Sequence, residues 1–166
     1  MQRLIIDGYS LLYRDSEAEL SRKGNFRFTR EQLIRKIDRL AGSLAPLVEL
    51  VFDGRAGGGR ERVDLTGLHV VYSPSHQTAD TVIERLVHES SRTDQVCVVT
   101  SDRLERDTVT AAGAQAMSCA AFLEWLDRLD REVARKTGPS GRAAGRFTLG
   151  DAFPGQVGIL GAQPEG

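Results

Sequence analysis

The sequence predicts an α/β fold with a doubly wound, mainly parallel central sheet flanked by helices. Three observations support this prediction. Short apolar runs without polar alternation are typical of strands buried on both faces. These runs alternate with segments of helical periodicity, as expected of strand–helix–strand units. Three of the runs are followed closely by an aspartate, at the sheet edge where ligands bind in open α/β folds.

Length and composition agree with a globular domain. The chain has 166 residues, of which 40% are hydrophobic and 27% charged, and its net charge is -1. These values are typical of neither a disordered nor a membrane-spanning chain, and they do not by themselves indicate a nucleic-acid partner. No leader peptide is visible, and Cys97 and Cys119 form no metal or redox motif. We therefore expect a cytoplasmic protein with reduced cysteines and no membrane partner.

The first predicted strand lies in the opening stretch Arg3–Ser10. Its leucine and isoleucine residues lead to Asp7, which we place at the tip of the central strand. Gly8 follows and permits a tight turn with close approach of another group. Residues Leu11–Leu20 then form either a short helix or an ordered loop, and residues 21–28 have a basic, turn-like composition.

A long helix is predicted before the second strand. Thr29 and Gln32 have the spacing of a capping box, which favours a helix start at this point. Apolar residues recur at helical spacing over Leu33–Leu44. Pro46 then marks the end of the helix.

The second strand repeats the pattern of the first. Val48–Phe52 is apolar and is followed by an aspartate and a glycine, Asp53 and Gly54. Residues 55–62 form a glycine-rich basic loop, and Leu68–Tyr72 is the third predicted strand.

The second half of the chain continues the alternation. Thr78 is a predicted N-cap, and the elements expected after it are a helix over Ala79–Ser90, a strand over Val96–Val99, a helix over Leu104–Ala112 closed by Gly113, a strand over Gln115–Met117 and a helix over Ala120–Lys136. From residue 138 glycine and proline recur and periodicity is lost. We therefore expect a domain over residues 1–137 and a tail or covering arm over residues 138–166.

Four aspartates occupy positions that a parallel sheet brings to one edge: Asp7, Asp53 and Asp102 after strands, and Asp80 in the first turn of a helix. Carboxylates within about 4 Å repel by roughly 1 kcal/mol per pair in water, and several-fold more when partly buried. Such a cluster requires cations or shared protons. Oxygen ligands without histidine or cysteine favour Mg²⁺ or Mn²⁺. Each acid also has a structural explanation, as a turn residue or at a helix N-terminus.

Five short motifs occur in an order that resembles a YacP-like NYN domain of the PIN-like nuclease superfamily. They are Ile5–Ser10, Val51–Gly54, Thr78–Asp80 with Ile83 and Glu84, Val98–Asp102, and Gly113-Ala114 before Met117-Ser118. The resemblance covers about residues 3–130. It implies a PIN-like fold and a metal-dependent endoribonuclease that uses Mg²⁺ or Mn²⁺ to hydrolyse RNA. It also implies a role in mRNA decay, with the ribosome as a candidate partner.

By position, the resemblance makes Asp7, Asp80 and Asp102 the catalytic acids that hold the metal. It also indicates a set of supporting residues: Ser10, Asp53, Glu84, Thr100 and Ser101. The family usually has asparagine at the position of Ser10, and serine has a shorter reach. Candidate RNA contacts, mainly to the phosphate backbone and through one aromatic ring, are Tyr9, Arg55, Arg60, Arg62, His76 and Arg103.

Two other function classes remain open at this point. A receiver-like phosphoacceptor domain would use Asp53 as its acceptor, although the expected acidic pair near the first strand and a late lysine are absent. A nuclease-like module without catalysis would bind RNA or the ribosome and cut nothing. Serine in place of asparagine at position 10 keeps this second class open.

Overall fold

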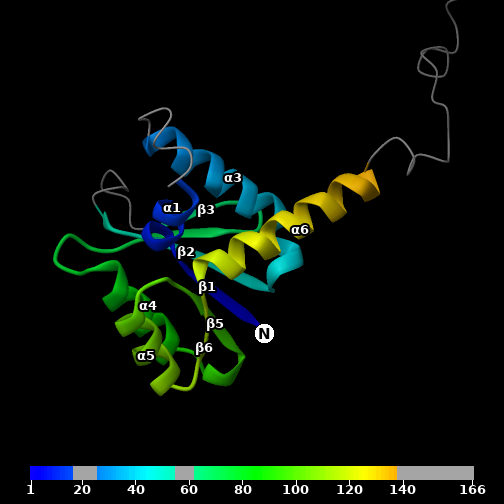
Figure 1. Ribbon diagram of the computed structural model, residues 1–166. Coiled ribbons are helices and arrows are strands. Elements are labelled where there is room, and N and C mark those ends of the chain that lie inside the picture. Colours follow the sequence, from blue (N-terminus) through cyan, green and yellow to red (C-terminus); the bar gives the residue numbers. More distant parts are fainter. Residues whose placement is uncertain (17–25, 55–61, 138–166) are drawn as a thin grey trace, which may run out of the picture. The chain divides into compact units, whose positions relative to one another are not determined.

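The computed structural model describes residues 1–16, 26–54 and 62–137, which form a mixed α/β fold around one sheet (Figure 1). The strands are β1 (Arg3–Asp7), β2 (Leu47–Phe52), β3 (Arg62–Asp64), β4 (His69–Tyr72), β5 (Val96–Val99) and β6 (Gln115–Met117). The helices are α1 (Gly8–Ser16), α3 (Phe26–Leu44), α4 (Ala79–His88), the short 3-10 helix η2 (Thr93–Gln95), α5 (Arg103–Ala111) and α6 (Cys119–Thr137).

The six strands have the order β3-β4-β2-β1-β5-β6, and all neighbours are parallel except β3 and β4. The central strand is β1, in which Ile6 pairs with Leu50 of β2 and with Val99 of β5. Its residues Leu4 to Ile6 are completely buried, as expected of a strand covered on both faces. The predicted doubly wound, mainly parallel sheet is therefore confirmed.

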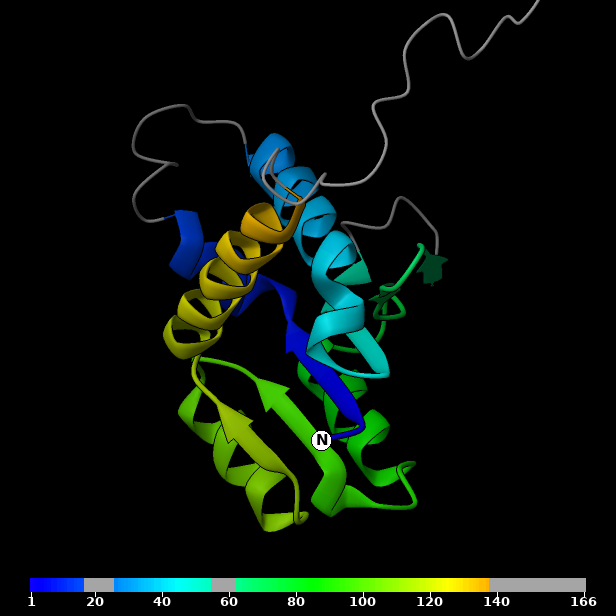
Figure 2. The same cartoon turned by 90° about the vertical axis from the view of Figure 1, so that its right-hand side faces the viewer.

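Helices cover both faces of the sheet (Figures 1 and 2). Helices α4 and α5 pack on one face of the sheet. The strand residues Ile5, Val51 and Val98 form a core there with Val82 and Ile83 of α4. Helices α1 and α3 lie on the opposite face. Helix α6 lies beside α3, to which it is joined by two ion pairs, Lys36–Asp127 at 2.6 Å and Arg39–Asp130 at 2.9 Å.

The strand order creates a switch point beside β1. The chain runs from β1 to β2 and β4 on one side, and then crosses through α4 to β5 on the other side. Ligands of open α/β sheets bind at such a point, beyond the carboxyl ends of the strands. Among the parallel strands the order is 3-2-1-4-5, whereas the receiver-like order is 2-1-3-4-5. The receiver-like alternative is therefore wrong.

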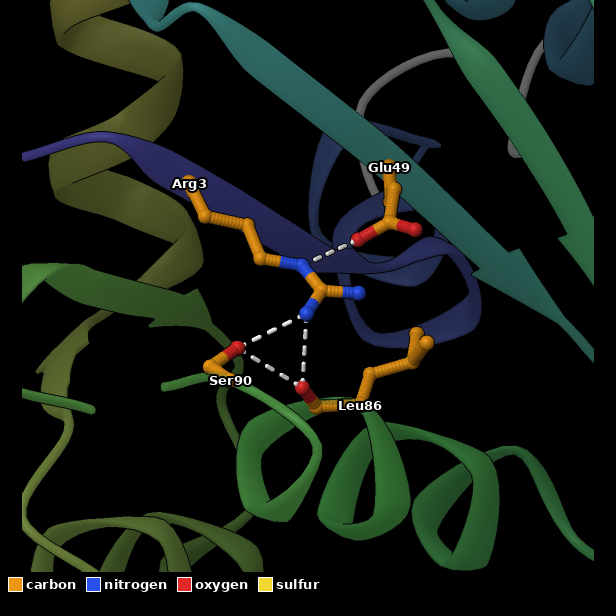
Figure 3. Close-up of polar contacts among 4 residues, drawn as sticks. All are labelled: Arg3, Glu49, Leu86 and Ser90. Atoms are coloured by element: carbon orange, nitrogen blue, oxygen red, sulfur yellow. Dashed lines mark hydrogen bonds and ion pairs between the residues drawn. The ribbon is translucent and has the colours of Figure 1, made fainter. Parts of the chain in front are cut away.

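A partly buried ion pair connects the sheet to the end of α4 (Figure 3). Arg3 of β1 donates from Nε to Oε2 of Glu49 on β2 at 2.6 Å. Its Nη1 donates to the carbonyl oxygen of Leu86 at 2.8 Å and to the hydroxyl of Ser90 at 2.7 Å. Since Leu86 lies in α4 and Ser90 just after it, one guanidinium fixes that helix against two strands.

The N-terminus of α3 differs from the prediction. The helix begins at Phe26, so Thr29 lies within it and the capping-box assignment is wrong. The capping-box spacing is a local signal, and a helix that already runs through this position overrides it. Of the two alternatives for residues 11–20, a short helix or an ordered loop, the helix is found as far as Ser16, where α1 ends. The prediction contains no strand at β3 and places its first residue, Arg62, in the loop 55–62. The strand is only three residues long and largely exposed, so it shows little periodicity.

No element is predicted at the short η2, and the other strands and helices match their predictions to within two residues. Thr78 caps α4 by accepting a hydrogen bond from the Thr81 N–H, and Gly113 has the positive φ of 92° expected after a helix. Residues Met1–Glu132 form one compact unit. The expected tail, 138–166, lies outside the described residues. Within those that are described, no helix combines the length and the apolar character needed to span a membrane.

Candidate metal centre

Asp7 ends β1 and directly precedes α1. Its Oδ1 accepts hydrogen bonds from the backbone N–H groups of Tyr9 at 3.0 Å and Ser10 at 3.2 Å. The residue is only 6% exposed. The N–H groups at a helix N-terminus attract acceptor oxygens, so this turn orients the Asp7 carboxyl group at the edge of the central strand. Gly8 makes the turn possible, because a Cβ there would lie 2.4 Å from the ring of Phe52.

Asp80 lies in the first turn of α4, on the face of the sheet opposite to α1 (Figure 2). Its side chain is more exposed than that of Asp7. Partial burial raises the pKa of the Asp80 carboxyl, and the negative charges of Asp7, Asp102 and Glu84 raise it further. Carboxyl groups from three separate elements therefore lie close to Asp80, which agrees with the predicted meeting of Asp7 and Asp80.

Glu105, in the first turn of α5, is the third member of the group. It is 4% exposed, and neither of its carboxylate oxygens accepts a hydrogen bond of good geometry from the described residues. Burial raises the pKa of Glu105 to about 7, and the charges of Asp7, Asp80 and Asp102 act in the same direction. The nearby Thr100 hydroxyl only partly offsets this effect. A buried carboxylate without donors is costly unless a proton or a cation compensates it.

The three acids form a group that is able to hold a cation. One carboxylate oxygen from each of Asp7, Asp80 and Glu105 lies within 4.8 Å of the other two. At such distances the mutual repulsion is roughly 1 kcal/mol per pair in water and larger in a partly buried site. The donor set contains only oxygen, which suits Mg²⁺ or Mn²⁺ rather than zinc. The unpartnered oxygens of Glu105 are consistent with a cation ligand.

Asp102 occupies a different position from the one expected of a metal ligand. Its side chain caps α5, with Oδ1 accepting from the N–H groups of Leu104 at 2.7 Å and Glu105 at 3.3 Å. It is not a member of the three-acid group, although it is near enough to raise the pKa values of Asp80 and Glu105. A direct role of Asp102 in holding the metal stays a prediction.

Glu105 is absent from the residues predicted for the site, although the sequence carries a signal for it. Helical spacing places Glu105 four residues before Val109, on the buried face of α5. A charged residue on a buried helical face is rare unless it is paired or functional. Glu105 also lies three residues after the N-cap Asp102, so its backbone N–H, but not its side chain, is used by the cap.

The predicted supporting residues are distributed around the acidic group. Thr100 is buried and accepts a hydrogen bond from the Asp102 N–H at 3.1 Å, which shapes the loop after β5. Ser10 contributes its backbone N–H to Asp7, and Ser101 is exposed beside it in a shared pocket. Glu84 lies near enough to act on Asp80. Asp53 follows β2 and does not belong to the three-acid group.

The predicted RNA contacts are more scattered than the acids. Arg62 begins β3, which β4 and β2 separate from β1, and it forms an ion pair with Asp64 at 2.6 Å. His76 is exposed in the loop before α4, and Arg103 is exposed at the start of α5. Tyr9 packs edge-on against Phe52, with ring centroids 5.7 Å apart. The remaining two, Arg55 and Arg60, lie outside the described residues.

Known proteins resemble this chain over most of its length. The family model described as "YacP-like NYN domain" matches residues 4–147. The "Uncharacterized protein YacP" of Bacillus subtilis (strain 168) is 25% identical over 155 residues, which are 91% of each chain. A crystal structure of a mutant of Rae1 (YacP) from Bacillus subtilis matches with a TM-score of 0.64 at 25% identity, covering 82% of this chain and 81% of that one. A second crystal structure of Rae1 (YacP) has the same TM-score at 24% identity, with 82% and 79% covered.

Proposed function

The chain belongs to the family of YacP-like NYN domains, and we propose that it is a metal-dependent endoribonuclease. In this proposal Asp7, Asp80 and Glu105 hold Mg²⁺ or Mn²⁺. A divalent cation bound there would activate water and neutralise the charge that develops on the phosphate being displaced. Hydrolysis would leave a 5′-phosphate and a 3′-hydroxyl. The family has a nuclease-like fold, and the three-acid group is the observation that carries the proposal.

The protein's own residues prepare this site in three ways. The two N–H groups that donate to Asp7 keep its carboxylate oriented at the tip of β1. The ion pair of Arg3 with Glu49, together with its bonds to the end of α4, holds the helix that carries Asp80. Burial of Glu105 excludes water from one side of the group. Such preorganisation lowers the reorganisation needed when a phosphate approaches.

RNA cleavage by the wild type and by three variants tests the proposal. We expect cleavage of a single-stranded RNA with Mg²⁺ or Mn²⁺ and none with EDTA. The double variant Asp7→Asn plus Asp80→Asn, and separately Glu105→Gln, should lose cleavage while keeping the wild-type circular dichroism spectrum. The matched control is Asp107→Asn, an exposed acid on the same helix as Glu105, which should cleave like the wild type. Equal cleavage by all proteins would refute the proposed site.

A catalytically inactive module that binds RNA or the ribosome is the second candidate, and Ser10 is the residue that favours it. The contact of Ser10 with Asp7 uses the backbone N–H, which serine supplies as well as asparagine, so what favours this candidate is the shorter reach of the serine side chain and not this contact. The variant Ser10→Asn separates the two candidates. RNA affinity without cleavage in both the wild type and Ser10→Asn, at any Mg²⁺ or Mn²⁺ concentration, would favour the binding module.

We further propose mRNA as the natural substrate and the ribosome as a partner, on the family resemblance alone. Co-sedimentation of the protein with ribosomes at low and high salt tests the second part. Transcript lengths in cells that express the wild type or the Asp7→Asn plus Asp80→Asn variant test the first. Cleaved mRNA fragments should be found only with the wild type.

A further inference from the structure

An open pocket of about 450 Å³ adjoins the acidic group between α1 and the loop after β5. Its lining residues are Tyr9, Ser10, Tyr13, Arg14, Ser101 and Asp102. The backbone N–H groups of Tyr9 and Ser10 are the donors that hold Asp7. Asp102, on the other wall, acts electrostatically on Asp80 and Glu105. A molecule in this pocket would therefore lie beside Asp102 and beside the two residues whose N–H groups hold Asp7.

The walls of the pocket combine an aromatic surface with a cation. Tyr13 is 62% exposed, one of few large hydrophobic side chains so exposed in the described part of the chain. Its ring centroid lies 6.4 Å from that of Tyr9, which is itself supported edge-on by Phe52. Arg14, the next residue of α1, is exposed as well. An exposed aromatic ring with a cation beside it at the mouth of a pocket indicates a binding surface.

A tyrosine ring and a guanidinium that line the same pocket are suited to bind a nucleotide. Unpaired bases stack on tyrosine rings, because every base has a π-face. A guanidinium binds a phosphate through two parallel hydrogen bonds. A base in a duplex remains stacked on its neighbours and is not available to such a ring. The pocket therefore favours a single-stranded nucleic acid over a duplex.

We propose that this pocket binds the nucleotide that flanks the cleaved bond in single-stranded RNA. The base stacks on Tyr13, and Arg14 contacts the phosphate backbone. This inference rests on the proposed function of the acidic group, because it assigns the neighbouring nucleotide of the same substrate. It makes Tyr13 and Arg14 determinants of strand preference rather than of chemistry.

Binding is measured in the Asp7→Asn plus Asp80→Asn background, so that no cleavage interferes. The readout is the fluorescence anisotropy of a labelled single-stranded RNA and of a duplex with the same sequence. Tyr13→Ala should weaken single-strand binding about 10-fold, Tyr13→Phe should retain it, and duplex binding should change with neither. Arg14→Ala should weaken binding and lower its dependence on salt by about one charge. In the cleaving protein, kcat/KM should fall by the same factors.

Two exposed residues distant from the pocket serve as matched controls. Leu65 follows the edge strand β3, and Arg92 lies just before η2, which leads into the amino end of β5. Leu65→Ala and Arg92→Ala should bind RNA like the parent protein. Unchanged affinity in Tyr13→Ala would overturn the pocket assignment even if the wild type cleaves RNA. Reduced affinity in Tyr13→Ala would support the pocket even if no cleavage is found, in which case the proposed function alone would fail.

Discussion

The Asp102 carboxylate accepts a hydrogen bond from the backbone N–H of Glu105, 3.3 Å away. Asp102, which was expected to hold a metal, thus caps helix α5, and this helix places Glu105 in the three-acid group. The two residues have separate tasks in this arrangement. Asp102 fixes the N-terminus of α5, and Glu105 contributes the buried carboxylate.

Replacement of Glu105 by glutamine should stabilise the cation-free protein at alkaline pH. The pKa of Glu105 is about 7 in the folded protein and 4.5 as its ordinary value. Between these values the folded state holds a proton that the unfolded state has lost. Stability therefore falls as the pH rises from about 4.5 to about 7. The loss is on the order of 1–3 kcal/mol, at about 1.4 kcal/mol per pKa unit.

Urea unfolding in EDTA at pH 5 and pH 8 measures this effect. The wild type should be less stable at pH 8, and Glu105→Gln should lose most of that difference. Asp107→Asn, on the same helix, should behave like the wild type. A Glu105→Gln protein with the full wild-type pH dependence would contradict the assignment.

Two substitutions of Asp102 separate its capping role from its charge. Asp102→Ala should cost about 1 kcal/mol of stability, because the N-cap is lost, whereas Asp102→Asn should cost little since asparagine is a good N-cap. Asp102→Asn should nevertheless weaken Mn²⁺ binding, because it removes a nearby negative charge. If that charge acts only through space, it contributes roughly 1 kcal/mol, and the affinity should fall by less than about 10-fold. Thermal unfolding and Mn²⁺ titration measure the two effects. A larger loss of affinity in Asp102→Asn would make Asp102 a direct ligand.

Replacing one member of the partly buried pair of Arg3 and Glu49 should destabilise the protein more than replacing both. Arg3→Met leaves the Glu49 carboxylate buried without its partner, which should cost about 3 kcal/mol. The double variant Arg3→Met plus Glu49→Leu should recover much of this loss. A double-mutant cycle by urea unfolding measures the coupling, and Arg92→Ala, which removes an exposed pair with Asp94, is the control. Additive losses would show that the two side chains do not interact.

Alanine should have opposite effects at two glycines in helices. A Cβ on Gly8 would lie 2.4 Å from the buried Phe52 ring, so Gly8→Ala should cost about 1–3 kcal/mol through overpacking. Nothing lies within 4 Å of a Cβ on Gly42 in α3, so Gly42→Ala should stabilise by up to about 1 kcal/mol. Melting temperatures of the two variants provide the comparison. An equal effect at both positions would contradict the close approach at Gly8.

Much of the fold was predictable because its signals are local. The apolar runs of β1, β2 and β5, the cap at Thr78 and the glycine at 113 each depend on a few neighbouring residues. The two errors have the same origin. Thr29 has the spacing of a capping box inside a longer helix, and β3 is too short to show a period. Local signals do not specify how far an element extends or which short segment pairs with an edge.

Local sequence patterns predicted that carboxylates follow the strands of an α/β sheet, and they indicated Asp7, Asp80 and Asp102 as the candidate metal ligands. The position of β5 beside β1 and the inward orientation of Glu105 on α5, which completes the group, became known from the folded chain alone. The physical reason is that strand order and helix rotation depend on the packing of both faces of the sheet. No local sequence pattern indicates that two residues that meet there, such as Asp80 and Glu105, lie close together.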